Sequence, residues 1–263
     1  MASPLILLPP SEGKAPGGDG PAWEKAEQSF DELLKPRRQV LAALRKAMKE
    51  NEAARTKLLG VKGQRVAEAT AANLVAHKAA TLPAIERYTG VLYDALDYSS
   101  LPAGLRKRVD KQVVIFSGLW GAVRPGDLIP DYKLKMGAKL SGFGPPARFW
   151  RPLLTEALAG PAAGCVWDLL PNEHSAAWDS AVARSRIRVR FVDDVEKDGE
   201  RRLVTVAHWN KLLKGALVRY VVDQQLTDPA GLADFTHPEG YVYAPELTQV
   251  SGSLTEVSLV AVR

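Results

Sequence analysis

Two lysines stand three residues apart in residues 208–215, His-Trp-Asn-Lys-Leu-Leu-Lys-Gly, which follow a β-branched run at 203–206. Side chains with this spacing share one face of a helix, and free backbone N–H groups at a helix start bind anions. The segment therefore predicts a helix that begins beside an anionic ligand, with Lys211 and Lys214 contacting the ligand and Trp209 stacking on it. The alternative is a solvated lysine face on an amphipathic helix.

Charged side chains also occur where predicted strands end, and such segments can converge on one cleft. Arginine offers a fork to phosphate, a desolvated lysine can act as base or nucleophile, and a carboxylate can transfer protons. For an enzyme, we expect catalytic roles for Lys14, Glu173 and Lys211. The expected phosphate-binding residues are Arg124, Lys133, Lys214, Asn172 and Trp209. The alternatives are an exposed loop lysine at position 14 and, at position 173, a helix first-turn acid favoured by the dipole.

A glycine turn joins two predicted helices at residues 59–67 and contains Gly60, Lys62 and Gly63. It resembles the turn of a helix-hairpin-helix, whose backbone N–H groups contact a nucleic-acid phosphate. The turn is one residue longer than the usual Gly-x-Gly form. A plain helix–helix connection is therefore the alternative interpretation.

Composition restricts the partners and the compartment. A formal net charge of +5 favours an anionic partner, either DNA or a phosphate-bearing small molecule. The lone cysteine, Cys165, excludes an intrachain disulfide and a cysteine metal site, and the four histidines contain no His-x-x-x-His pair, so we expect no metal and no cofactor. No apolar run approaches the roughly 18–20 residues that span a bilayer, and the start lacks the pattern of a signal peptide. We expect a cytoplasmic protein without membrane contact.

Helical and strand patterns alternate along the chain without an internal repeat. This predicts one α/β domain over residues 1–263, with a mixed sheet and a helical subdomain at about 23–80. Further helices are expected from Pro83, from Pro102 and at 146–158. Expected strands lie at 5–8, 112–116, 132–136, 165–170, 187–192, 203–206, 240–243 and 256–262.

Short motifs in a fixed order run along nearly the whole chain, and together they resemble the YaaA family, also designated DUF328 or UPF0246. The motifs are Leu-Leu-Pro-Pro-Ser-Glu-Gly-Lys ending at Lys14, the segments 88–93 and 117–121, Arg124-Pro125 with Asp127, Tyr132-Lys133-Leu134 with Met136-Gly137, Phe149-Trp150, Asn172-Glu173, residues 208–215 and Glu239-Gly240-Tyr241.

The resemblance implies an unusual mixed α/β fold with a basic cleft and a helix-hairpin-helix-like element. It also implies a role in the peroxide stress response, which limits free iron and DNA damage, and binding of nucleic acid with little sequence specificity. No reaction is attached to the family as a whole, so whether the chain is an enzyme stays open.

Three positions depart from the family pattern. The family often has Tyr at the position of His174, commonly Arg at that of Lys133, and Glu or a small residue at that of Lys135. Exchanging Tyr for His moves a side-chain pKa from about 10 to about 6.5 and so changes acid–base chemistry near neutral pH. The alternative function is therefore an enzyme acting on a small anionic or nucleotide-like ligand in the same cleft, with a place in secondary metabolism.

Overall fold

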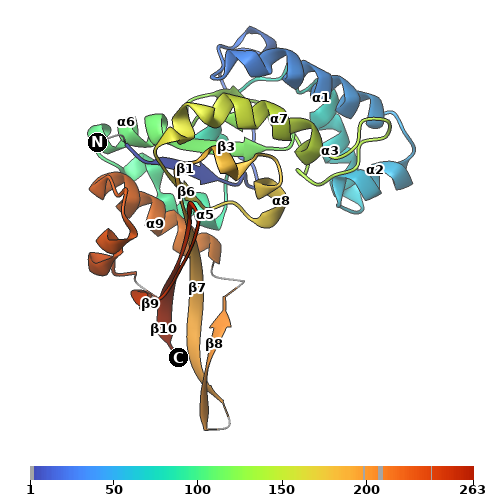
Figure 1. The fold of residues 1–263 in the computed structure, drawn as a ribbon. Coiled ribbons are helices and arrows are strands. Elements are labelled where there is room, and N and C mark those ends of the chain that lie inside the picture. Colours follow the sequence, from blue (N-terminus) through green and yellow to red (C-terminus); the bar gives the residue numbers. More distant parts are fainter. Residues whose placement is uncertain (1–2, 198, 207–209, 238) are drawn as a thin grey trace.

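A mostly parallel sheet forms the centre of the chain, which confirms the predicted mixed α/β class. The computed structural model describes residues 3–197, 199–206, 210–237 and 239–263. Within them, the strand order is β4-β3-β1-β6-β7-β10-β9, and β8 pairs with β7. Helices pack around this sheet, and a group of them extends away from it on one side (Figure 1).

The middle of the sheet consists of β1 (Leu5–Leu8), β3 (Val113–Ser117) and β6 (Cys165–Asp168). β1 pairs in parallel with both neighbours, and every residue of the three strands is buried. Continuous apolar runs suit this position because both faces of a parallel sheet are covered. The carboxyl ends of all three strands therefore meet at one edge of the sheet.

The remaining large strands form an arm that projects from the body (Figure 1). It contains β7 (Ser185–Lys197), β8 (Glu200–Thr205), β9 (Val242–Ser251) and β10 (Leu254–Val262). β7 and β8, which cover the strands expected at 187–192 and 203–206, pair antiparallel, and β10 pairs in parallel with β7. At the opposite side of the sheet, β4 (Gly121–Val123) pairs antiparallel with β3.

The region predicted as a helical subdomain contains α1 (Leu34–Ala47), α2 (Glu52–Leu59) and α3 (Gln64–Val75). α1 buries Val40, Leu41 and Leu44 along one side, the spacing expected of an amphipathic helix. The other helices are α4 (Ala84–Arg87), α5 (Val91–Leu96), α6 (Ala103–Gln112), α7 (Pro146–Ala159), α8 (Asn172–Ser175) and α9 (Asn210–Gln224).

The strand predicted at 132–136 does not form. A two-residue strand, β5 (Leu128–Ile129), precedes it and pairs with β2 (Leu82–Pro83). The segment still alternates between buried and exposed side chains, but a side chain satisfies its backbone: the Asn73 amide accepts from the Lys133 N–H at 2.8 Å and donates to the Lys133 carbonyl at 2.9 Å. A buried amide on α3 therefore takes the place of a neighbouring strand.

Candidate functional site

A small cavity of about 110 Å³ lies at the carboxyl edge of the central strands. The loop after β1 contributes Lys14, the segment after β5 contributes Tyr132, and α8 contributes Glu173 and His174. Ligands of α/β sheets bind outside the carboxyl ends of the strands. The structure thus brings Lys14, Lys133 and Glu173 together, three of the residues that the sequence singled out.

The Lys14 ammonium lies against aromatic rings. Its Nζ is 4.4 Å from the centroid of the Tyr132 ring and 5.7 Å from that of Tyr88, and it donates to the Ser11 carbonyl at 3.3 Å. Burial lowers the pKa of Lys14 to about 8, because the charged form loses its hydration. An amine of this kind can exist in its neutral form near physiological pH.

Two sets of contacts fix the surroundings of Lys14. The Tyr132 hydroxyl hydrogen-bonds both the Tyr88 hydroxyl and Ser117 Oγ at 2.7 Å, and burial raises the pKa of Tyr132 to about 12. The fully buried Arg87 guanidinium donates to the carbonyls of Ala15, Gly17 and Ile129 and so holds the loop that follows Lys14. The phenols stay neutral, and the lysine rests on a rigid platform.

Glu12 bridges two lysines at the mouth of the cavity. Its carboxylate lies 2.7 Å from Lys133 Nζ and 3.0 Å from Lys135 Nζ. The hydrogen bond from Lys133 lowers the pKa of Glu12 to about 2. The two ammonium groups are therefore spaced to hold one anion between them.

Glu173 and His174 lie on the short helix α8. Glu173 Oε1 accepts from the backbone N–H of Gly137 at 2.6 Å. Burial lowers the pKa of His174 to about 4, and its Nδ1 has no hydrogen-bond partner within the described part of the chain. At neutral pH the cavity therefore contains an uncharged imidazole beside Glu173.

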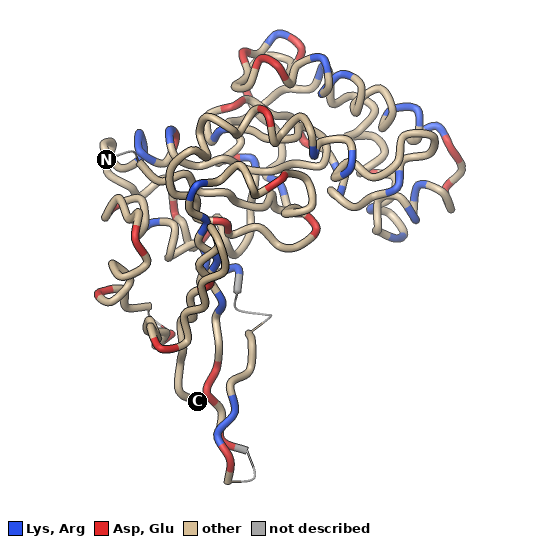
Figure 2. The backbone as a smooth tube through the Cα atoms, in the orientation of Figure 1, with Lys and Arg blue, Asp and Glu red and all other residues tan. Residues whose placement is uncertain are grey.

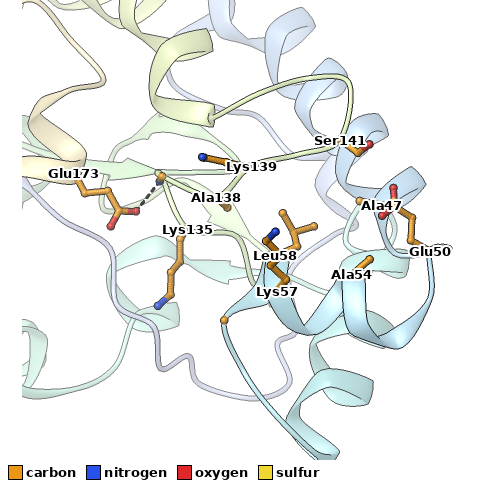
Figure 3. Close-up of a pocket in the computed structure, with 12 residues that line it drawn as sticks. Ala47, Glu50, Ala54, Lys57, Leu58, Lys135, Ala138, Lys139, Ser141 and Glu173 are labelled. Atoms are coloured by element: carbon orange, nitrogen blue, oxygen red, sulfur yellow. Dashed lines mark hydrogen bonds between the residues drawn. The ribbon is translucent and has the colours of Figure 1, made fainter.

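Two larger hollows continue from this cavity, and we call the three together the groove. One, of about 1060 Å³, shares Glu12 and Lys133 with the cavity and reaches the glycine turn after α2. The other, of about 580 Å³, shares Lys135 and Glu173 and runs between α8 and the helices α1 and α2 (Figure 3). The cationic residues of the two hollows are Lys57, Lys62, Arg65, Lys133, Lys135 and Lys139, and the acidic ones are Glu12, Glu50, Glu68 and Glu173.

The predicted glycine turn therefore lies on the groove. Gly60 ends α2 at φ 65° and Gly63 precedes α3 at φ 59°, a region that glycine adopts readily. A Cβ built on Gly60 would lie 3.5 Å from Lys135 Nζ, so the turn approaches the lysines of the 133–139 segment closely. Lysine and arginine recur along both segments (Figure 2).

Lys211 and Lys214 line a neighbouring cavity of about 560 Å³ with Asn172. Lys214 Nζ donates to the Leu169 carbonyl at 2.9 Å, and burial lowers its pKa to about 8, whereas the Lys211 side chain is exposed. The loop after β1 and helix α8 contribute to both this cavity and that of Lys14. The sequence predicted that these lysines share one cleft with Lys14 and Lys133. The structure places Lys14 and Lys133 in one cavity and Lys211 and Lys214 in an adjacent cavity on the same edge of the sheet.

Arg124 lies elsewhere. Its guanidinium donates to the carbonyls of Lys111 and Val113, at the amino end of β3, and stacks 5.4 Å from the Phe30 ring. The carbonyl contacts tie α6 to β3, and the structure does not bring Arg124 to the groove. Trp209, together with His208, lies outside the described residues.

The sequence interpretation missed Arg188 and Arg190, which line the Lys214 cavity. They alternate with Ile187, Val189 and Phe191 along β7, and a period of two places such residues on one face of a strand. That alternation was the available signal. Arg190 pairs with Glu256 at 3.1 Å, and Arg188 donates to the Leu170 carbonyl at 3.3 Å.

Two further observations apply to the described residues alone. They contain no group of three or more His, Cys, Asp or Glu side chains arranged to hold a metal ion. None of the helices in these ranges has the length and apolar content that crossing a membrane requires.

The fold and the groove define a mixed α/β protein with lysines gathered at the carboxyl edge of its sheet. The chain belongs to the YaaA family: it matches the family described as "Peroxide stress protein YaaA" over residues 5–247. It is similar to a UPF0246 protein of Streptomyces coelicolor, with 38% identity over 90% of this chain and 85% of the relative. A UPF0246 protein of Corynebacterium efficiens is 37% identical over 90% of this chain and 93% of the relative.

The burial of His174 predicts a fold that is sensitive to acid. Burial lowers the pKa of His174 from 6.5 to about 4, so the unfolded chain binds more protons between these two pH values. The free energy of unfolding should therefore fall as the pH falls through this window, by at most about 3 kcal/mol. Urea unfolding of His174→Gln and His174→Tyr at pH 4 to 7 should show a smaller loss than the parent chain. A loss identical in all three proteins would contradict the assignment.

Proposed function

We propose that this chain binds nucleic acid along the groove, with little sequence specificity. The supporting observation is the convergence of two segments far apart in the chain, the glycine turn at Gly60 and the lysines at 133 and 135. In this proposal the groove is the basic cleft of the family, and the turn with Lys62 and Gly63 is its helix-hairpin-helix-like element. Backbone N–H groups and lysines would contact phosphates and would make no contact with the base edges that carry the sequence.

The Glu12 bridge supports an anion site at this position. One carboxylate sits between Lys133 and Lys135, with separations of 2.7 and 3.0 Å. A phosphate oxygen accepts the same charge-assisted hydrogen bonds as a carboxylate. In the proposal, a phosphate replaces Glu12 between the two ammonium groups, and Glu12 competes with it in the unbound chain.

Binding should depend steeply on salt. Removing one side chain that binds a phosphate should reduce the slope of log K against log salt by about one unit. The double variant Lys62→Ala/Arg65→Ala should therefore bind a 20-base-pair duplex about tenfold or more weakly at low salt and should reduce that slope by about two. Fluorescence anisotropy at salt concentrations between roughly 50 and 200 mM measures the affinity and its salt slope, because contacts to phosphate dominate binding in about this range.

Matched variants separate the groove from net charge. Lys107→Ala/Lys111→Ala removes the same charge from exposed positions on α6, which leads into the amino end of β3, and should leave binding near that of the parent chain. Glu12→Ala should strengthen binding, because it removes the competing carboxylate. Equal weakening by both double variants, or binding that is insensitive to salt, would refute the proposal.

A second candidate function is an enzyme that acts on a small anionic or nucleotide-like ligand. The observation that favours it is Lys14, with its pKa lowered to about 8 in a cavity of about 110 Å³ beside Glu173. Here Lys14 or Lys211 would bind or activate the ligand, and Glu173 would transfer protons. A nucleotide that raises the melting temperature with concentration, in a chain that does not bind duplex DNA, would favour this function over the first.

A further inference from the structure

The amine of Lys14 has the environment of a nucleophile. Among the described residues its hydrogen bond is to the Ser11 carbonyl, and no carboxylate pairs with it at salt-bridge distance. Burial is the largest cause of its lowered pKa, so a substantial fraction of the amine is neutral near pH 8. A neutral lysine amine adds to carbonyl carbon, which a protonated one cannot do.

The size of the cavity restricts what can reach that amine. Its volume is about 110 Å³, the smallest of the three hollows that form the groove. A sugar fragment or a phosphate fits this space. Because the cavity opens onto the groove through Glu12, Lys133, Lys135 and Glu173, a nucleic-acid strand in the groove would present its sugar–phosphate backbone to Lys14.

Proton donors and acceptors line the same cavity. Glu173 is held by the Gly137 N–H at 2.6 Å, and His174 Nδ1 lacks a partner in the described part of the chain. A group of this kind is needed to carry a proton to a departing hydroxyl. The cavity thus combines an amine, a proton carrier and room for a sugar that has lost its base.

We propose that Lys14 condenses with the ring-opened aldehyde of an abasic site in DNA, an inference that rests on the proposed nucleic-acid binding. The neutral Nζ adds to C1′, forming the C–N bond, and one proton moves from nitrogen to the former carbonyl oxygen. Glu173 then takes the remaining N–H proton and passes it to that hydroxyl, the C–O bond breaks, and water leaves. Amine and aldehyde thus give imine and water, with no change in oxidation state.

Borohydride trapping tests this proposal. The full chain is incubated at pH 8 with a duplex that contains one abasic site, sodium borohydride is added to reduce the imine to a stable amine, and the covalent adduct is measured on a denaturing gel. We expect an adduct with the abasic duplex and none with the intact duplex. Lys14→Arg keeps the positive charge but lacks the nucleophile, and it should reduce the adduct about tenfold or more, whereas Lys107→Ala should not change it. Mass spectrometry of the parent adduct should locate the linkage on Lys14, which requires no variant to fold.

Three other results of this experiment would overturn the inference, and they differ in what they say about the proposed function. Binding of both duplexes without an adduct, or an adduct mapped to another lysine, overturns the inference and leaves the proposed nucleic-acid function intact. Trapping of free deoxyribose 5-phosphate as efficiently as the abasic duplex overturns the assignment to DNA and identifies a small sugar phosphate as the ligand. Failure to bind either duplex overturns the proposed function and the inference together.

Discussion

Replacing Asp168 by alanine should lower the free energy of unfolding by about 3–5 kcal/mol, because it leaves the Arg186 guanidinium, whose side chain is 13% exposed, without its counter-charge. Asp168 ends β6, and its side chain is fully buried. Arg186 Nε donates to its Oδ2 at 2.8 Å, and the Leu170 N–H donates to its Oδ1 at 3.0 Å. The carboxylate therefore fixes the start of the loop that leads to α8. Urea unfolding with a common m-value measures the loss.

Two comparisons test the cause of this loss. Glu200→Ala breaks an ion pair of similar length, 2.8 Å to Arg202, but both side chains are more than half exposed, and the cost should stay below about 1 kcal/mol. The double variant Asp168→Ala/Arg186→Met removes both charges of the pair and should recover part of the stability. If Asp168→Ala costs no more than Glu200→Ala, the buried pair does not stabilise the sheet edge.

The central strands could be predicted because each is a short continuous apolar run. The strand at 5–8 lies where the sequence indicated, and the strand predicted at 165–170 begins at Cys165 and ends at Asp168. β9 and β10 are longer than predicted, since β9 ends among exposed polar residues such as Gln249 and Ser251 and β10 begins at the half-buried Leu254 and Thr255. Backbone hydrogen bonds to a neighbouring strand extend β9 and β10, and the local pattern of residues does not indicate that pairing.

The convergence of Lys14 and Glu173 follows from one rule: both segments leave the carboxyl ends of parallel strands. The same rule misplaced Arg124. The glycine-rich loop after β3 turns sharply, and β4 returns antiparallel to β3. A residue that follows β4 therefore arrives at the amino edge of the sheet. Strand direction depends on tertiary pairing, which the sequence of the loop does not specify.

The glycine turn illustrates a different limit. Its two glycines and the helices on either side were predictable from composition, and Gly60 and Gly63 both have positive φ. Its approach to Lys135 was not predictable, since it depends on how α3 packs against the segment that Asn73 holds. The chemistry of the groove arises from that packing.

Gly215→Ala should destabilise the fold by about 2 kcal/mol or more, although alanine normally favours a helix interior by about 1 kcal/mol over glycine. Gly215 lies in α9, where that helix crosses α5. A Cβ added there would meet the Leu92 carbonyl, would lie 2.6 Å from Ala95 Cβ and would lie 2.9 Å from the Leu96 nitrogen. Backbone atoms cannot rotate away from such a contact, so α9 must shift.

Gly104→Ala is the matched control, because an added Cβ in α6 would meet no atom within 4 Å, and the free energy of unfolding of that variant should rise by up to about 1 kcal/mol.

The shift of α9 in Gly215→Ala should also change the surroundings of Lys214. Lys214 stands one residue before Gly215 and donates to the Leu169 carbonyl at 2.9 Å. If α9 moves away from α5, this hydrogen bond should break and the Lys214 ammonium should regain hydration, so its pKa should rise from about 8 toward its ordinary value. Chemical unfolding and titration of a ¹³C-labelled lysine measure the two effects, and a Gly215→Ala chain as stable as the parent would show that the helices separate without cost.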